Sequence, residues 1–218
     1  MIQPREIPPV FTPDNEPYLG LESLLWFDRI ICWSMESNTK VAGWTRQNSN
    51  ALTSLQRAGC QIIPQGFSIA LSIRELIRQA YLVSARILVR PLIERAAVVS
   101  YLESHPGAVS EWENGWRHGT RPSLATMLAS MAGGIPVAEA QKICSAHNHM
   151  VHGDPLSCYD NLIPLPDGAA GYASSKILNN PRLCDEIAFE SQCYLIVLSG
   201  RMASIFPDVG LQSPPKRN

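Results

Sequence analysis

The segment from Cys144 to Asp154 holds the densest group of side chains that could do chemistry, including three of the chain's five histidines. If the segment is helical, Asn148 and His152 lie about 40° apart around the helix axis and share one face. A histidine at the C-terminal end of a helix is favoured in its protonated form, which suits a general acid or a phosphate contact. The structural alternative is that these histidines cap the helix and bond to loop carbonyls.

The same segment and the residues after it also contain side chains of the types that bind metals. They are Cys144, His149, His152, Asp154 and Cys158. His149 and His152 are three residues apart and could chelate, but His149 is expected to face away from Cys144. No standard zinc spacing is present. We therefore expect no metal and no cofactor.

A second polar group lies on a predicted long helix, where Arg86, Arg90 and Glu94 recur at intervals of four residues. This spacing places them in one line on an otherwise apolar helix, and it allows Arg90 and Glu94 to pair. Two interpretations remain open. The pair is either a buried ion pair that sets the helix register, or an arginine that a carboxylate orients toward an anionic ligand.

The two groups together resemble a bacterial family of unknown function and, through it, the HEPN superfamily of helical bundles. The family has a central Arg-x-x-x-Glu, matched here by Arg90 and Glu94, and a later Ser/Asn-x-x-x-His-Gly/Pro, matched by Asn148, His152 and Gly153. The resemblance covers residues 67–206. HEPN ribonucleases of toxin–antitoxin and anti-phage systems carry Arg-(polar)-x-x-x-His near a helix end. In that motif His147 stands at the arginine position.

The resemblance implies a metal-independent endoribonuclease that acts on RNA in bacterial stress or phage defence. By this reading His152 is the general acid/base and Asn148 positions it, while Arg90 and His147 contact phosphate. Glu94 would orient Arg90, and Arg86 would extend the same phosphate-binding line. The resemblance also implies a homodimer in which the two motifs face each other.

The residue at position 147 departs from the ribonuclease motif. A histidine is shorter than an arginine, lacks its bidentate fork and is only partly charged at neutral pH. The alternative function is therefore a non-catalytic helical module that binds or senses a protein partner.

Composition limits these functions further. The 218 residues carry 18 Lys and Arg against 19 Asp and Glu, so the net charge is −1, and RNA binding would need a local basic patch. The six cysteines form no Cys-x-x-Cys pair, which indicates reduced thiols without disulfides. Neither a signal peptide nor a membrane-spanning run is recognisable, so we expect a cytoplasmic protein with no membrane association.

Hydrophobic periodicity and the positions of proline and glycine predict an all-α bundle with little or no sheet. We expect a Pro-rich extended arm over residues 1–18, one helical domain over 19–207 and a flexible tail over 208–218. The predicted helices cover residues 20–37, 47–58, 67–104, 108–116, 122–133, 136–153 and 181–206. The helix over 67–104 is expected to be central and kinked at Pro91.

Two connecting segments have functional interpretations. The long loop over 154–179 is expected to contact the bundle near His152. The short polar stretch with Trp112, Trp116, His118 and Arg121 is expected either to stack on a base or to pack under the bundle.

Overall fold

Helices account for most of the fold in this computed structural model, which describes residues 10–117, 119–131, 134–152, 155–164, 168–173 and 175–216. The α-helices are α1 (Glu22–Gln47), α2 (Ser54–Arg78), α3 (Leu82–Ser104), α4 (Ala108–Glu113), α5 (Leu124–Ala129), α6 (Val137–His152) and α7 (Pro181–Ile205). Short 3-10 turns lie at η1 (Ser49–Ala51), η2 (Pro155–Asn161) and η3 (Pro207–Val209), and the strands are β1 (Leu162–Pro164) and β2 (Ala170–Tyr172). The predicted helical class is confirmed.

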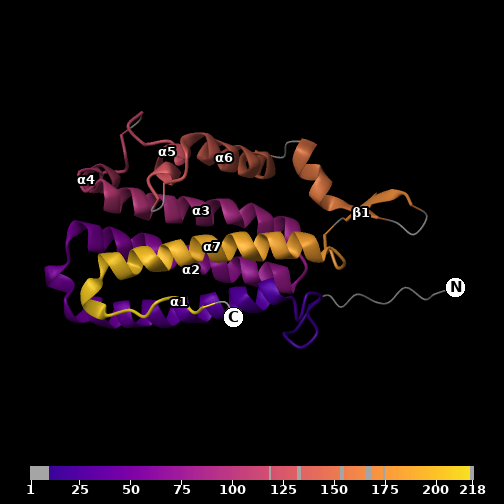
Figure 1. Cartoon of the computed structure of the whole chain (residues 1–218), viewed down its shortest axis with the longest axis horizontal. Helices are drawn as coiled ribbons and strands as arrows, with labels where there is room; N and C mark the ends of the chain where they lie inside the picture. The colour runs from indigo at the N-terminus through magenta and orange to yellow at the C-terminus, as the bar shows by residue number, and fades with distance from the viewer. Residues whose placement is uncertain are drawn as a thin grey trace.

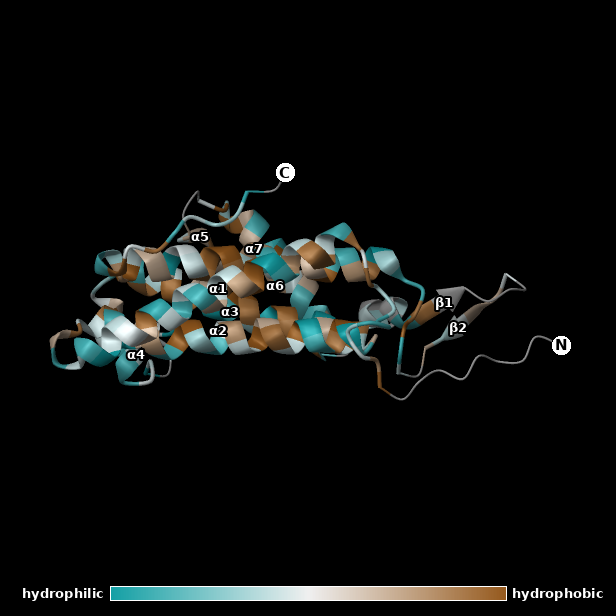
Figure 2. Ribbon diagram, turned by 90° about the horizontal axis from the view of Figure 1, so that it is seen from below, coloured by the Kyte–Doolittle hydropathy of each residue, from teal (hydrophilic) through white to brown (hydrophobic). Residues whose placement is uncertain are grey.

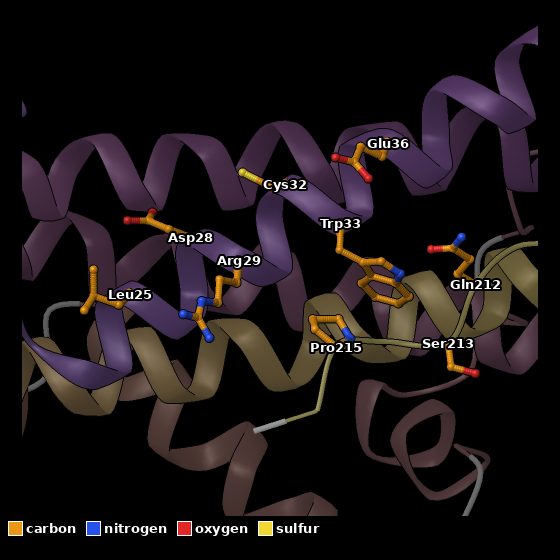
Figure 3. A pocket seen from close by; sticks show the side chains of 9 residues that line it. All are labelled: Leu25, Asp28, Arg29, Cys32, Trp33, Glu36, Gln212, Ser213 and Pro215. Carbon is orange, nitrogen blue, oxygen red and sulfur yellow. The ribbon is translucent and has the colours of Figure 1, made fainter. Parts of the chain in front are cut away.

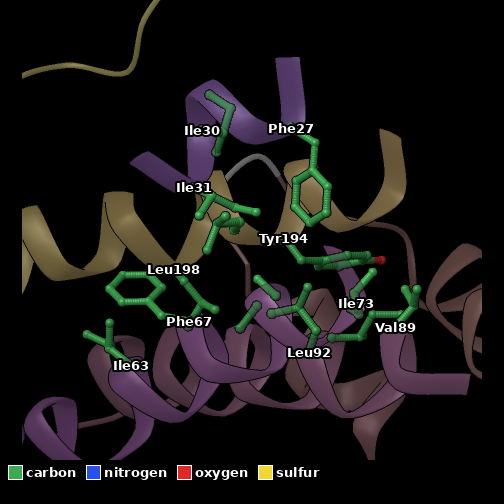
Figure 4. Close-up of a cluster of buried hydrophobic side chains, with 14 of the residues drawn as sticks. Phe27, Ile30, Ile31, Ile63, Phe67, Ile73, Val89, Leu92, Tyr194 and Leu198 are labelled. Atoms are coloured by element: carbon green, nitrogen blue, oxygen red, sulfur yellow. The ribbon is translucent and has the colours of Figure 1, made fainter. Parts of the chain in front are cut away.

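The four long helices α1, α2, α3 and α7 form the body of the bundle, with α7 packed against the other three (Figure 1). Hydrophobic and polar residues both occur along these helices (Figure 2). Their apolar stripes meet in one core whose members include Phe27, Ile73, Leu92, Tyr194 and Leu198 (Figure 4). On the outer side of α3, the shorter helices α5 and α6 pack together (Figure 1). This layer carries the histidine-rich segment.

The helix predicted over 67–104 is wrong, because the chain turns between α2 and α3 and the two helices pack side by side. Tyr81 N donates to Leu76 O at 2.8 Å and Ala80 N donates to Ile77 O at 2.9 Å, which is the Schellman pattern that ends a helix. Ala80 occupies the left-handed position of this pattern, with φ +63°. Glycine normally takes that position, so the sequence carries no stop signal here.

The separate helix predicted over 47–58 is also wrong, and the first helix is longer than expected. α1 continues to Gln47, while α2 begins after Thr53, whose side chain and that of Gln56 form a reciprocal capping box. α2 continues through Gly59, which is buried against Ile205 and Phe206 of the opposing segment. Pro64 in α2 and Pro91 in α3 both lie inside their helices. Favourable packing along these helices offsets the cost of each proline.

The described part of the arm closes over one end of the bundle rather than running straight. It follows turns between residues 13 and 20, and it buries Phe11 and Tyr18. The backbone N and O of Phe11 each bond to the Gln79 side chain at 2.8 Å. Residues 1–9 of the predicted arm lie outside the described residues.

The C-terminal segment lies along α1 (Figure 1). Gln212, Ser213 and Pro215 line one side of a hollow of about 600 Å³, and α1 residues including Asp28, Arg29 and Trp33 line the other (Figure 3). Flexibility of the tail over 208–218 stays a prediction, and residues 217 and 218 lie outside the described part of the chain.

The segment predicted as a loop over 154–179 contains local structure. It holds η2 and an antiparallel hairpin in which Leu162 pairs with Tyr172, the one sheet found among the described residues. The segment returns to the bundle at Ile177, whose N donates to Ala80 O at 2.9 Å and whose carbonyl accepts from the Tyr18 hydroxyl. The segment therefore contacts the bundle at two places, through η2 against α6, which ends at His152, and through Ile177 at the α2–α3 turn.

No helix within the described ranges has an apolar stretch long enough to cross a bilayer.

Candidate functional site

The side of α3 that faces α6 and α7 carries the predicted polar line. Arg86, Arg90 and Glu94 are partly buried there, with side chains 22%, 17% and 28% exposed. The helical spacing of four residues explains their common direction. Each of the two arginines contacts a carboxylate, so the line is an ion-pair network set between helices.

Arg90 joins the two segments that the sequence singled out. Its Nη1 donates to Asn148 Oδ1 at 2.6 Å and to the Cys144 carbonyl oxygen at 3.2 Å, and its Nε donates to Glu94 Oε1 at 3.2 Å. Arg90 therefore contacts the 147–152 segment through Asn148. One guanidinium binds the α3 carboxylate and two oxygens of α6, which fixes the position of α6 along α3.

His147 points into the protein, on the other side of α6 from solvent. Its side chain is 4% exposed, and Nε2 lies 2.6 Å from Glu190 Oε1 on α7. The second oxygen of Glu190 lies 3.5 Å from Arg86 Nη1. A carboxylate only accepts, so Nε2 carries the proton of this bond, while the buried Nδ1 has no hydrogen-bond partner among the described residues. His147 and Arg90 thus contact different carboxylates and do not converge on one phosphate position.

Glu190 is the functional-site residue that the sequence reasoning missed. It lies three residues after Ile187 and four before Tyr194, so it falls on the apolar stripe of α7. A carboxylate on such a stripe requires a buried partner. The position of Glu190 on this stripe is the feature of the sequence that could have indicated a buried ion pair. The partners of Glu190 depend on how α7 packs against α3 and α6.

His152 is the last residue of α6 and is exposed. Asn148, one turn earlier on the same helical face, is also exposed apart from its bond to Arg90. His149 lies beside them, with Nε2 3.3 Å from Ser145 Oγ. Gly153, predicted to end the helix, lies outside the described residues. The surface row is therefore Arg90, Asn148 and His152.

Cys144 adds a thiol to this site but not a reactive one. Burial raises the pKa of Cys144, the positive charge of Arg90 offsets part of that effect, and Glu94 adds to it. The thiol is therefore protonated at neutral pH, and a thiolate nucleophile is not available.

The metal-ligand set considered from the sequence is not brought together in the described part of the chain. Within it, no three His, Cys, Asp or Glu side chains lie close enough to hold an ion. Asp154 and the side chain of Cys158, two members of that set, lie outside the described residues.

The chain was compared with known protein families, curated proteins and solved structures. No protein-family model, curated protein or solved structure matches the chain.

Proposed function

We propose that this chain is a HEPN-like helical protein that binds and cleaves RNA at the face where α6 meets α3. The observation that carries the proposal is the 2.6 Å bond from Arg90 Nη1 to Asn148 Oδ1. This bond places the Arg90 guanidinium beside Asn148, which lies on the same face of α6 as His152. The departure at position 147 is then less damaging, because Arg90 of another helix supplies the cation that His147 cannot.

The two α6 residues of the row are neighbours on one helical face. Asn148 and His152 are four residues apart, which is about 6 Å along a helix axis. The Nη2 of Arg90 makes no hydrogen bond among the described residues and remains for a phosphate oxygen. The exposed imidazole of His152 lies at the end of α6, where a ribose can approach.

The proposed reaction is an internal transesterification of RNA. The ribose 2′-oxygen attacks the adjacent phosphorus as His152 accepts the 2′-hydroxyl proton, and the bond from phosphorus to the 5′-oxygen breaks. The leaving 5′-oxygen takes a proton from water, and the products are a 2′,3′-cyclic phosphate end and a 5′-hydroxyl end. Arg90 stabilises the negative charge on the phosphate oxygens.

Glu190 and His147 have a positioning role in this scheme. Their bond holds the buried side of α6 against α7, while Arg90 holds the adjacent side against α3. The two contacts fix the rotation of α6 about its axis, so Asn148 and His152 face outward together. Glu94 orients the Arg90 guanidinium through its Nε.

The test is incubation of the purified chain with total RNA in EDTA, followed by analysis of the RNA ends. We expect cleavage with 2′,3′-cyclic phosphate ends, a loss of at least about 100-fold in His152→Ala and a smaller loss in Arg90→Met. His105→Ala is the matched control, because His105 is an exposed histidine at the end of α3 that stacks on Tyr101. The proposal also includes a homodimer, so the chain should sediment at about twice 24.0 kDa.

Cleavage that persists unchanged in His152→Ala would assign the activity to another nuclease and reject the proposal.

A second function, a non-catalytic module that binds a protein, is favoured by one observation. Both Arg86 and Arg90 already pair with carboxylates, Glu190 and Glu94. If the wild-type chain neither binds nor cleaves RNA, this second function replaces the first.

A further inference from the structure

The turn that follows α4 holds a tryptophan in a strained conformation. Trp116 N donates to Glu111 O at 2.8 Å and Gly115 N donates to Trp112 O at 2.9 Å, so a Schellman pattern ends the helix. Gly115 has φ +80°, which glycine tolerates, but Trp116 has φ +43°. A bulky residue in the left-handed region is uncommon, and such strain gathers at ligand sites.

The strained turn forms one wall of a hollow of about 290 Å³. Trp112 and Trp116 line it together with Gln65 of α2, Arg95 of α3 and Arg121, which follows the turn. Both indole rings are partly buried, so the backbone and the neighbouring helices hold them in place. The volume is at the lower limit for small-molecule sites.

The charges in this hollow differ from those of the α3–α6 site. Neither Arg95 nor Arg121 forms an ion pair with a carboxylate of the described residues, and no acidic residue lines the hollow. Arg95 Nε donates to the neutral Gln65 Oε1 at 2.9 Å. The guanidinium of Arg121 lies 5.6 Å from the centre of the Trp116 ring. Two arginines without a carboxylate partner in the described part of the chain therefore lie beside two indole rings.

We propose that this hollow binds a mononucleotide. An indole supplies a stacking surface for the base, and the two guanidiniums supply donors for the phosphate. The small volume favours a single free nucleotide over a strand. This inference does not rest on the proposed ribonuclease function, because Arg95 projects from α3 about 140° away from Arg90.

The experiment is titration of the intact chain with adenosine 5′-monophosphate, followed by calorimetry and by tryptophan fluorescence. We expect saturable binding, with weaker binding of adenosine, which lacks the phosphate, and of ribose 5-phosphate, which lacks the base. Arg121→Ala should weaken binding about 10-fold. Arg95→Gln, which keeps a polar side chain beside Gln65, should weaken it by a similar factor.

Arg117→Ala is the matched control, because Arg117 is exposed in the same turn region but lines a different hollow. It should change affinity by less than about 2-fold. Absence of saturable binding of the nucleotide would overturn the proposal, as would equal binding of ribose 5-phosphate or equal loss in Arg117→Ala. Binding of a single-stranded oligonucleotide through Arg121 without binding of the mononucleotide would also overturn it.

Discussion

At the scale of single residues, Glu190 determines how the candidate site is built. Its two carboxylate oxygens face a buried imidazole on one side and a guanidinium on the other, at 2.6 Å and 3.5 Å. A buried polar group without a partner costs free energy, so each of the three side chains depends on the other two. His147 therefore turns inward, and the residue after it, Asn148, is left to meet Arg90 on α3.

Replacement of Glu190 should destabilise the chain. In Glu190→Ala the buried Nε2–H of His147 loses its acceptor and Arg86 loses its carboxylate, so unfolding free energy should fall by roughly 2–3 kcal/mol. Urea denaturation measures this change. Glu186→Ala is the control on the same helix, because its partner Arg182 is 90% exposed, and it should cost less than about 0.5 kcal/mol. Equal losses in the two variants would mean that Glu190 forms only a surface pair.

At the scale of the helices, α2 and α7 approach each other closely through glycines of α2. Gly59 lies against Ile205 and Gly66 lies against Leu198, so a step of seven residues along α2 matches a step of seven back along α7. Seven residues are close to two helical turns, and the same faces of these antiparallel helices therefore meet twice. The small residues explain why a helix with two glycines and a proline persists.

Gly66→Ala should test this contact. The added Cβ would clash with Leu198 Cδ1, and Leu198 is fully buried and has little room to move. We expect a net destabilisation of roughly 1–3 kcal/mol in thermal or urea unfolding, despite the better helix propensity of alanine.

The matched variant is Gly43→Ala, in the exposed face of α1, where a Cβ meets no atom within 4 Å. It should stabilise the chain by about 0.5–1 kcal/mol, because only the backbone entropy changes. A stabilisation by Gly66→Ala of the same size would show that α2 and α7 are not in close contact.

At the scale of the whole molecule, the described part of the arm is bonded to the bundle through a cluster of charges. Arg74 donates to both oxygens of Glu16 at 2.8 Å and to Asp28 Oδ1 at 2.6 Å. Burial lowers the pKa of Arg74, but its hydrogen bonds and charge attraction to Glu16 and Asp28 outweigh that effect and raise it. The guanidinium is thus charged at every accessible pH and joins the arm, α1 and α2.

Cys184 and Tyr18 lie near this cluster and are uncharged at neutral pH. We predict that their ionisation lowers the stability of the chain at alkaline pH. Burial is the main cause that raises the pKa of Cys184 to about 12 from 9.0, and burial likewise raises that of Tyr18 to about 12 from 10.0. The unfolded chain loses these protons first, so the contribution of the two groups to stability is fully present below about pH 9 and is lost as pH rises from 9 toward 12. Each group contributes a slope of up to about 1.4 kcal/mol per pH unit.

Urea midpoints measured between neutral pH and about pH 11 check this slope. Tyr18→Phe and Cys184→Ala should each make the decline less steep, since each removes one titrating group. A stability that stays constant across this range would contradict the burial of both groups.

Local patterns in the sequence determined the helical class and several helix ends. Asn180 caps α7, and its Oδ1 accepts from Leu183 N at 3.1 Å, as expected from the Asn-Pro pair. The match of Asn148 and His152 on one face follows from helical geometry alone, and so does the pairing of Arg90 with Glu94. These features involve neighbours within one or two helical turns, which a sequence shows directly.

Tertiary structure alone decided where the long helices break and which groups the buried histidine and arginines contact. Ala80 takes a left-handed conformation that alanine disfavours, and Gly59 and Pro64 remain helical. His147 pairs with a carboxylate 43 residues away. The physical reason is one of magnitude. Local preferences differ by about 1 kcal/mol per residue, whereas burial of side chains against distant helices contributes several times more.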